Sequence, residues 1–368
     1  MRKSYTIVLV VLVALAGLAA WGQWRLEGAL DAQSQAPEGT RVVVRPGESV
    51  RSVLGQLAGV RAVADPRWVA LYLRLHSQRV RVQAGTYELA PQASVRQILR
   101  QLDEGQVVLE QLTIVEGWTF AQMRAALDAT PDLVHEWRAL DAAQLMAALG
   151  ASGVHPEGRF YPDSYRFAAG TTDRKIYEMA FARMRERLAA EWADRAPGLP
   201  VASEDEALVL ASIVEKETAR DDERARVAAV FTNRLRRHML LQTDPTVIYG
   251  LGAAYDGNLR RRDLEADTPY NTYTRAGLTP TPIALPGGAS VHAALHPAAE
   301  ASLYFVASGK GDDSHHFSAT YEEHRAAVLQ FLKATGAKPD RQALGSSPAG
   351  SSPAGSSPAG SSPTGKGP

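Results

Sequence analysis

The chain has 368 residues, 45% of them hydrophobic, which is enough for two or three domains with apolar cores of their own. Its 40 Lys and Arg residues balance 40 Asp and Glu residues, and no long basic run occurs, so nucleic acid is not an expected partner. The absence of cysteine excludes disulfides, thiolate metal sites, a cysteine nucleophile and a lipidated N-terminal cysteine.

The N-terminal segment predicts a membrane anchor. Arg2 and Lys3 precede an uncharged, mostly apolar run at 5–24, and roughly 20 such residues cross the hydrocarbon core of a bilayer. The basic pair favours a cytoplasmic N-terminus. A cleaved signal peptide is the alternative, with residues 14–16 as a small-residue cleavage site. Because the apolar run continues past that site, we expect one uncleaved span within residues 1–26, with everything after it outside the cytoplasm.

A polar tether at 27–40 should connect this anchor to a small α+β module at 41–105. Within the module, a strand pattern, two helix patterns and a second strand pattern follow one another. The helices begin after Ser49 and at Asp65-Pro66, where a serine cap and an N-terminal proline are typical starts. This order resembles LysM-type glycan-binding units, although a plain structural spacer would have the same pattern.

The larger region at 106–336 predicts a mixed α+β domain built around a helical hairpin at 203–237. The first helix starts with the spacing of a capping box, and residues 208–214 are apolar on nearly every side, which indicates a buried helix. Acidic residues mark the start of the second helix. In the tail at 337–368, the sequence from Gly345 repeats Gly-Ser-Ser-Pro-Ala and has nothing to bury, so we expect the tail to be disordered.

Two carboxylates end the first helix of the hairpin. Burial at the edge of an apolar core raises the pKa of a carboxyl group, which a general acid needs near neutral pH. Glu215 and Glu217 lie about 200° apart around a helix, so they cannot face one site. Periodicity does not choose between them, and a salt bridge to Lys216, Arg220 or Arg224 is an equally weighted structural role.

Two polar clusters further along the chain indicate a cleft wall that binds sugar. The first interrupts the apolar run at 239–250, and the second, at 270–273, places an amide and a hydroxyl between two aromatic rings. Rings can stack on the C–H faces of a sugar while the polar groups bond its hydroxyls. A strained surface loop would use similar residues, and Asp244, which precedes Pro245, could simply cap a turn. The expected substrate-binding residues are Gln242, Thr243, Asp244, Tyr270, Asn271 and Tyr273.

No metal or other cofactor is expected. A zinc site would need paired histidines at ligand spacing with a nearby carboxylate, whereas the adjacent His315 and His316 should point apart. The chain has no glycine-rich phosphate loop and no Gly-x-Ser-x-Gly elbow.

Several of these motifs, in one order, closely resemble the endolytic murein transglycosylase family (MltG, or YceG-like). The resemblance covers the anchor and nearly everything from Arg41 to Leu332. One mild departure is Arg159, where the family more often has an aromatic or aliphatic residue. The motifs lie at residues 84–87, 115–117, 161–163, 211–218, 241–250, 270–273 and 296–297.

The resemblance implies a single-pass inner-membrane enzyme with a cytoplasmic N-terminus and a periplasmic catalytic domain. It would cut nascent peptidoglycan strands without water, beside peptidoglycan synthases, and so terminate glycan elongation. A glutamate would protonate the oxygen between N-acetylmuramic acid (MurNAc) and N-acetylglucosamine (GlcNAc), and the muramic C6 hydroxyl would attack C1 and leave a 1,6-anhydro end.

The resemblance also selects one of the two glutamates. In lytic transglycosylases the catalytic Glu sits at a helix end directly before Ser or Thr, which fits Glu217 before Thr218 and not Glu215. One carboxylate suffices because an intramolecular hydroxyl replaces the activated water that most hydrolases require. The alternatives are a muramidase that hydrolyses the same bond and a non-catalytic scaffold that binds peptidoglycan.

Overall fold

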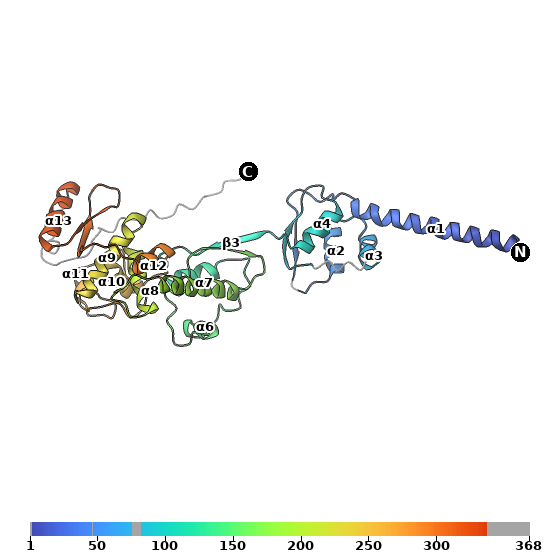
Figure 1. Ribbon diagram of the computed structural model, residues 1–368. Coiled ribbons are helices and arrows are strands. Elements are labelled where there is room, and N and C mark those ends of the chain that lie inside the picture. Colours follow the sequence, from blue (N-terminus) through green and yellow to red (C-terminus); the bar gives the residue numbers. More distant parts are fainter. Residues whose placement is uncertain (1, 46, 76–81, 337–368) are drawn as a thin grey trace. The chain divides into compact units, whose positions relative to one another are not determined.

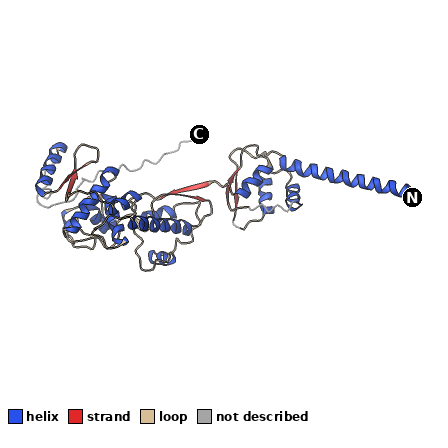
Figure 2. Cartoon of the chain, viewed as in Figure 1, coloured by secondary structure: helices blue, strands red, loops and turns tan. Residues whose placement is uncertain are grey.

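The computed structural model describes residues 2–45, 47–75 and 82–336 (Figure 1). Helices dominate, and the strands form three two-stranded sheets, β1-β2, β3-β4 and β5-β6 (Figure 2). The mixed helix and sheet class predicted from the sequence is therefore confirmed. The likeness of the first module to LysM units stays a prediction, and the predicted disordered tail lies outside the described residues.

The described chain divides into two compact units. Unit 1 comprises residues 2–112, 130–136 and 165–173, and unit 2 comprises residues 113–129, 137–164 and 174–336. Each has a hydrophobic core of its own.

The N-terminal helix α1 (Arg2–Asp31) is the one helix in the described residues that is long and apolar enough to cross a membrane. The candidate span, Leu9–Asp31, has a mean hydropathy of 1.6, and a signal sequence would have similar properties. The last turns of α1 differ from the polar tether expected at 27–40. Leu26 and Leu30 lie one turn apart and are buried in the core of unit 1, which explains why the helix continues to Asp31.

The rest of unit 1 is a small α+β core. Strands β1 (Arg41–Val44) and β2 (Gly85–Glu88) pair antiparallel. Burial alternates along β1, so that two valines face the core. Helices α2 (Val50–Gly59), α3 (Pro66–Leu75) and α4 (Val95–Glu104) supply the remaining apolar side chains.

Unit 2 contains most of the helices and carries the residues of the predicted site. Figure 1 shows α8, α9, α10 and α12 gathered in one group. Most elements that follow α4 in the sequence belong to unit 2, whereas most of β3 and most of β4 belong to unit 1. The elements that follow α4 are β3 (Leu109–Thr113), α5 (Phe120–Asp128), α6 (Ala142–Ala148), β4 (Ser164–Ala168), α7 (Asp173–Ala193), α8 (Glu204–Glu217), α9 (Asp221–Arg236), α10 (Asp244–Leu251), the 3-10 turn η1 (Gly252–Ala254), α11 (Arg261–Glu265), α12 (Gly288–Leu295), β5 (Tyr304–Ala307), β6 (His315–Ser318) and α13 (Tyr321–Thr335).

The central helix of unit 2 is α8. The side chain of Ser203 accepts a hydrogen bond from the backbone N–H of Glu206, which caps the helix start. Every residue from 207 to 214 is buried, in agreement with the apolar sequence, and packs in one core with α7, α9 and α12. The helix ends where this apolar run meets Glu217, so the fold delivers a carboxylate to the edge of the core.

Candidate active site

Glu217 is the last residue of α8, and its carboxylate accepts a hydrogen bond from the hydroxyl of Thr243. The pKa of Glu217 is raised from 4.5 to about 8, chiefly by burial, and the neighbouring charge of Asp244 acts in the same direction. The Thr243 hydrogen bond and the positive charge of Arg234 act in the opposite direction. Glu217 therefore carries a proton at neutral pH, as a general acid must.

The side chain of Glu215 makes its contacts in a different part of unit 2. Its carboxylate accepts a hydrogen bond of 2.9 Å from the backbone N–H of Gly287, at the N-terminus of α12. The carboxylate of Glu116 lies against the same glycine, where a Cβ atom would come within 2.0 Å of its Oε1. Burial, and then the charge of Glu215, raise the pKa of Glu116. The two glutamates of α8 thus point to separate environments, as their 200° separation requires.

A set of buried threonines fixes the segment that touches Glu217. The backbone N–H of Thr243 donates to the hydroxyl of Thr272 at 3.1 Å. The hydroxyls of Thr246 and Thr272 lie 2.9 Å apart, and Thr246 also donates to the Thr243 carbonyl at 2.7 Å. Thr272 was not among the predicted site residues. Its position between two predicted tyrosines was the available signal.

Asp244 and Tyr273 form a second polar pair beside Glu217. The Tyr273 hydroxyl donates to Asp244 Oδ1 at 2.5 Å. Burial raises the pKa of Asp244, and the bond from Tyr273 lowers it. The turn-capping alternative for Asp244 is wrong in this structure, because Thr243 occupies the N-cap of α10 and no side chain there makes a capping hydrogen bond. The side chain of Asp244 bonds instead to the 270–273 cluster.

Gln242 is held by a buried arginine that the sequence analysis missed. Arg234, on α9, is fully buried and donates from Nη1 to Gln242 Oε1 at 3.4 Å and to the Leu241 carbonyl at 3.0 Å. Its Nε donates to the Leu303 carbonyl at 2.7 Å. Burial lowers the pKa of Arg234 to about 10, so it stays charged at neutral pH. The available signal was an arginine at helical spacing from the buried Val230 and Phe231.

The structure does not bring Tyr270 and Asn271 to Glu217 through any described contact. The buried amide of Asn271 donates to the carbonyls of Asp263, Leu264 and Ala266 and accepts from the N–H of Tyr273 at 2.8 Å. The Tyr270 hydroxyl lies 2.9 Å from the hydroxyl of Thr281. Asn271 organises the loop that presents Tyr273.

A second carboxyl group with a strongly raised pKa lies elsewhere in unit 2. Glu157 is buried and accepts hydrogen bonds from the Phe120 N–H at 2.8 Å and the Tyr249 hydroxyl at 3.0 Å. Burial raises its pKa to about 7. Both partners are internal, so Glu157 joins α5 to α10.

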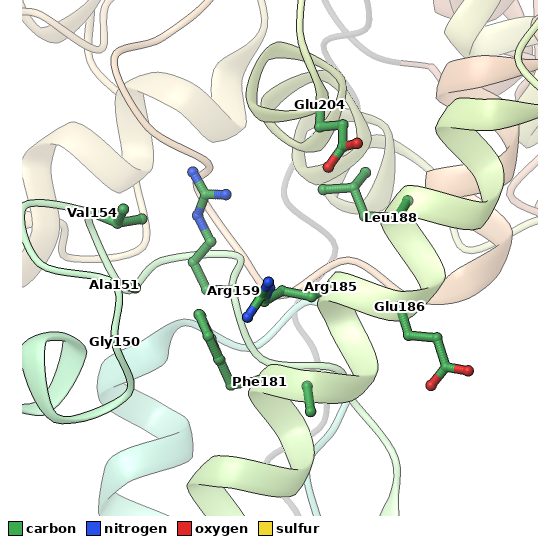
Figure 3. A pocket seen from close by; sticks show the side chains of 11 residues that line it. Gly150, Ala151, Val154, Arg159, Phe181, Arg185, Glu186, Leu188 and Glu204 are labelled. Carbon is green, nitrogen blue, oxygen red and sulfur yellow. The ribbon is translucent and has the colours of Figure 1, made fainter.

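One hollow of unit 2 lies apart from these residues. Its volume is about 680 Å³, and it is lined by α7 and the loop before Arg159 (Figure 3). Arg159 also forms an ion pair of 2.6 Å with Asp205. None of the predicted site residues lines this hollow.

Comparisons with known proteins identify the family of this chain. The endolytic murein transglycosylase of Bacillus subtilis is 33% identical, over 70% of this chain and 75% of that protein. The protein of the same name from Streptococcus pneumoniae D39 is 25% identical, over 90% of this chain and 66% of that protein. A crystal structure of a yceG-like protein from Listeria monocytogenes is 30% identical, covers 78% of this chain and 98% of that one, and superposes with a TM-score of 0.49. A sequence model of the YceG-like family matches residues 42–330, and the chain therefore belongs to the YceG-like family.

Proposed function

We propose that this chain cleaves the bond between MurNAc and GlcNAc in nascent peptidoglycan strands and leaves 1,6-anhydro-MurNAc ends, so that glycan elongation stops. Membership of the family and the name of the curated relatives identify the enzyme class as a lytic transglycosylase of peptidoglycan. The observation that supports the finer assignment is the protonated Glu217 beside Thr243 and Asp244.

In the proposed reaction, Glu217 gives its proton to the glycosidic oxygen as the bond from that oxygen to muramic C1 breaks. The muramic C6 hydroxyl then forms a bond to C1, and its proton returns to the Glu217 carboxylate. The reaction consumes no water, and Glu217 ends protonated, as it was at the start. Thr243 donates to the carboxylate that forms between the two steps, and the nearby carboxyl of Asp244 favours positive charge developing at C1.

Hydrolysis of the same bond is the second candidate. The observation that favours it is that Asp244 supplies a second carboxyl group near Glu217, and hydrolysing glycosidases generally use two carboxylates. The two reactions differ in the ends they leave: 1,6-anhydro ends for the transglycosylase and reducing ends for the muramidase.

The test is digestion of isolated sacculi by the full-length protein in detergent, followed by mass spectrometry of the muropeptides. We expect anhydro ends, and their loss in Glu217→Gln. Glu215→Gln is the matched control, because it changes the neighbouring carboxylate on the same helix. Activity of a folded Glu217→Gln protein would remove Glu217 as the acid, and reducing ends alone would establish the muramidase.

We also propose that the enzyme is anchored in the inner membrane by α1, with its N-terminus in the cytoplasm and residues 41–336 in the periplasm. The length and hydropathy of α1 support this, as do the basic Arg2 and Lys3 in the sequence. A nascent strand as substrate implies that the enzyme works beside peptidoglycan synthases. Residues 41–105 would bind glycan as a LysM-like module, while residues 106–336 carry catalysis.

Membrane topology can be measured directly. The full-length protein should resist extraction with high salt and carbonate, and external protease should digest it in spheroplasts while leaving a small membrane-embedded fragment. Release by salt alone would contradict a spanning helix. A mature protein lacking residues 1–16 would identify α1 as a cleaved signal.

A further inference from the structure

Two histidines and a glutamate of unit 2 converge on one point outside the candidate active site. His292 lies on α12, and His296 directly follows the last residue of that helix. The two histidines are four positions apart in the sequence, so both rings lie on one face of the helix. Glu191 comes from α7. One ligand atom from each of the three residues lies within 4.8 Å of the other two.

The distances around this cluster are those of a ligand set. His292 Nδ1 is 2.8 Å from Glu191 Oε2, and His296 Nε2 is 3.8 Å from the same oxygen. Zn²⁺ binds imidazole nitrogen and carboxylate oxygen at about 2.0–2.2 Å, so neighbouring ligand atoms of a tetrahedral site are roughly 3.3 Å apart. The two distances lie on either side of that separation.

A second, independent observation is a buried ring nitrogen of His296 that lacks a hydrogen-bond partner in the described part of the chain. The Nε2 atom of His296 is buried and has no hydrogen-bond partner among the residues that the structure describes. The nearest carboxylate oxygens, Glu191 Oε2 at 3.8 Å and Asp194 Oδ2 at 3.9 Å, are too distant for a hydrogen bond. Buried polar atoms without partners are uncommon and carry a free-energy cost. A nitrogen aimed between two carboxylates at that range suits coordination to a cation.

We propose that Glu191, His292 and His296 bind Zn²⁺, with Asp194 or solvent in the fourth position. Arg187 donates to the other oxygen of Glu191, Oε1, at 2.8 Å and leaves Oε2 for the ion. This orients the ligand in the way that outer hydrogen bonds orient metal-binding carboxylates. No hydrogen bond or ion pair joins these groups to Glu217 in the described structure, so the ion is structural and joins α7 to α12.

This proposal departs from the expectation of no metal. The sequence analysis considered the adjacent His315 and His316 and overlooked the spacing of His292 and His296, which is His-x-x-x-His. On a helix that spacing places two imidazoles side by side, and their rings are indeed stacked with centroids 4.3 Å apart. The carboxylate is about 100 residues away in sequence, so no local pattern could have supplied it.

The experiment is a titration of the full-length, tag-free protein in detergent with zinc chloride after treatment with a chelator. Calorimetry should give one ion per chain, and Co²⁺ in place of Zn²⁺ should give the visible absorption bands of a tetrahedral site. Loss of an outer-shell partner costs about 10–100-fold in metal affinity, so loss of a ligand in His292→Gln or Glu191→Gln should cost at least that much. His316→Gln changes an exposed histidine elsewhere and should bind zinc as the unmodified protein does.

Zinc should raise the melting temperature of the unmodified protein and of His316→Gln, and leave that of His292→Gln unchanged. Because His292 is exposed, its substitution should leave the metal-free fold intact. Absence of stoichiometric zinc binding would overturn the proposal, and so would full affinity in His292→Gln. A lower melting temperature of His292→Gln in chelator, with no zinc response in either protein, would show an ordinary His–Glu ion pair instead.

Discussion

At the scale of single residues, the proposed reaction depends on how strongly the surroundings of Glu217 hold its proton. Burial and the nearby Asp244 carboxyl favour the protonated form, whereas the Thr243 hydroxyl and Arg234 favour the ionised form. A general acid has to give up its proton during the reaction and regain it afterwards. The opposed influences keep the pKa of Glu217 near 8 instead of letting burial make the group permanently neutral.

The pH dependence of cleavage follows from this pKa. The rate on soluble glycan strands should fall as the pH rises through about 8, because the acid loses its proton. Measurement of kcat/KM between pH 6 and 10 tests this. A rate that increases over that range would show that the ionised form of Glu217 is the active one.

The same pKa has a consequence for stability. A carboxyl group with a folded pKa of about 8 and an unfolded value near 4.5 favours folding fully below pH 4.5, and that contribution is lost as the pH rises through 8. The melting temperature of Glu217→Gln relative to the unmodified protein should therefore increase from pH 5 to pH 9. Calorimetric scans at several pH values check this, and parallel curves would indicate an ordinary pKa.

Thr243 should act on the rate through Glu217. Thr243→Val removes the hydrogen bond that favours the ionised carboxylate, so the rate should fall by about 10-fold and the alkaline limb of its pH profile should move upward. Thr243→Ser keeps the hydroxyl and should restore both. A purely structural role would lower the melting temperature of Thr243→Val without moving the pH profile.

At the scale of elements, Arg234 links α9, the segment before α10 and the segment before β5. Replacement by Met leaves buried carbonyls of Leu241 and Leu303 without their donors, which should cost about 2–5 kcal/mol in the free energy of unfolding. Urea unfolding of Arg234→Met tests this, with the exposed Arg237→Met on the same helix end as control. Equal stability of the two variants would mean that the carbonyls find other donors.

The elements that the sequence predicted well have a strong local signal. The hairpin of α8 and α9, the strands of unit 1 and the burial of residues 207–214 follow from apolar periodicity and capping residues. The start of helix α12 has no local signal in the sequence, because Gly287 and Gly288 mask it. These glycines are required by tertiary contacts: a Cβ at residue 288 would lie 2.6 Å from the Tyr161 hydroxyl.

The site was predictable in composition and not in detail. Polar residues inside an apolar run identified the region of residues 242–244, but whether Asn271 faces the cleft or the loop depends on carbonyls brought near it by folding. Arg234 and Thr272 act through backbone groups that folding brings near them, so the local signals at these two residues did not reveal their roles. The choice of Glu217 over Glu215 rested on the resemblance to a family, and it remains a prediction until the two variants are compared.

At the scale of the whole molecule, α1 belongs to unit 1 as much as to the proposed membrane span. A protein lacking residues 1–25 should be soluble, fold and cleave soluble glycan, because it retains Leu26 and Leu30. A protein lacking residues 1–35 loses both, and deletion of even one buried leucine side chain commonly costs about 2–5 kcal/mol. Comparison of the melting temperatures of the two proteins tests this. Equal values would mean that the end of α1 contributes nothing to the core.

Because α1 continues without a break into unit 1, the number of residues in the helix determines the direction in which unit 1 faces about the helix axis. With Leu26, Ala29 and Leu30 fixed in the core of unit 1, the proposed membrane span continues into that unit without a flexible joint. Each residue added to the helix before Leu26 would turn unit 1 by about 100° about the helix axis and lift it by about 1.5 Å. One inserted alanine would therefore make unit 1 face another direction along the membrane surface. An insertion of seven residues is close to two full turns, so it would nearly restore the original direction of unit 1 while raising that unit by about 10 Å.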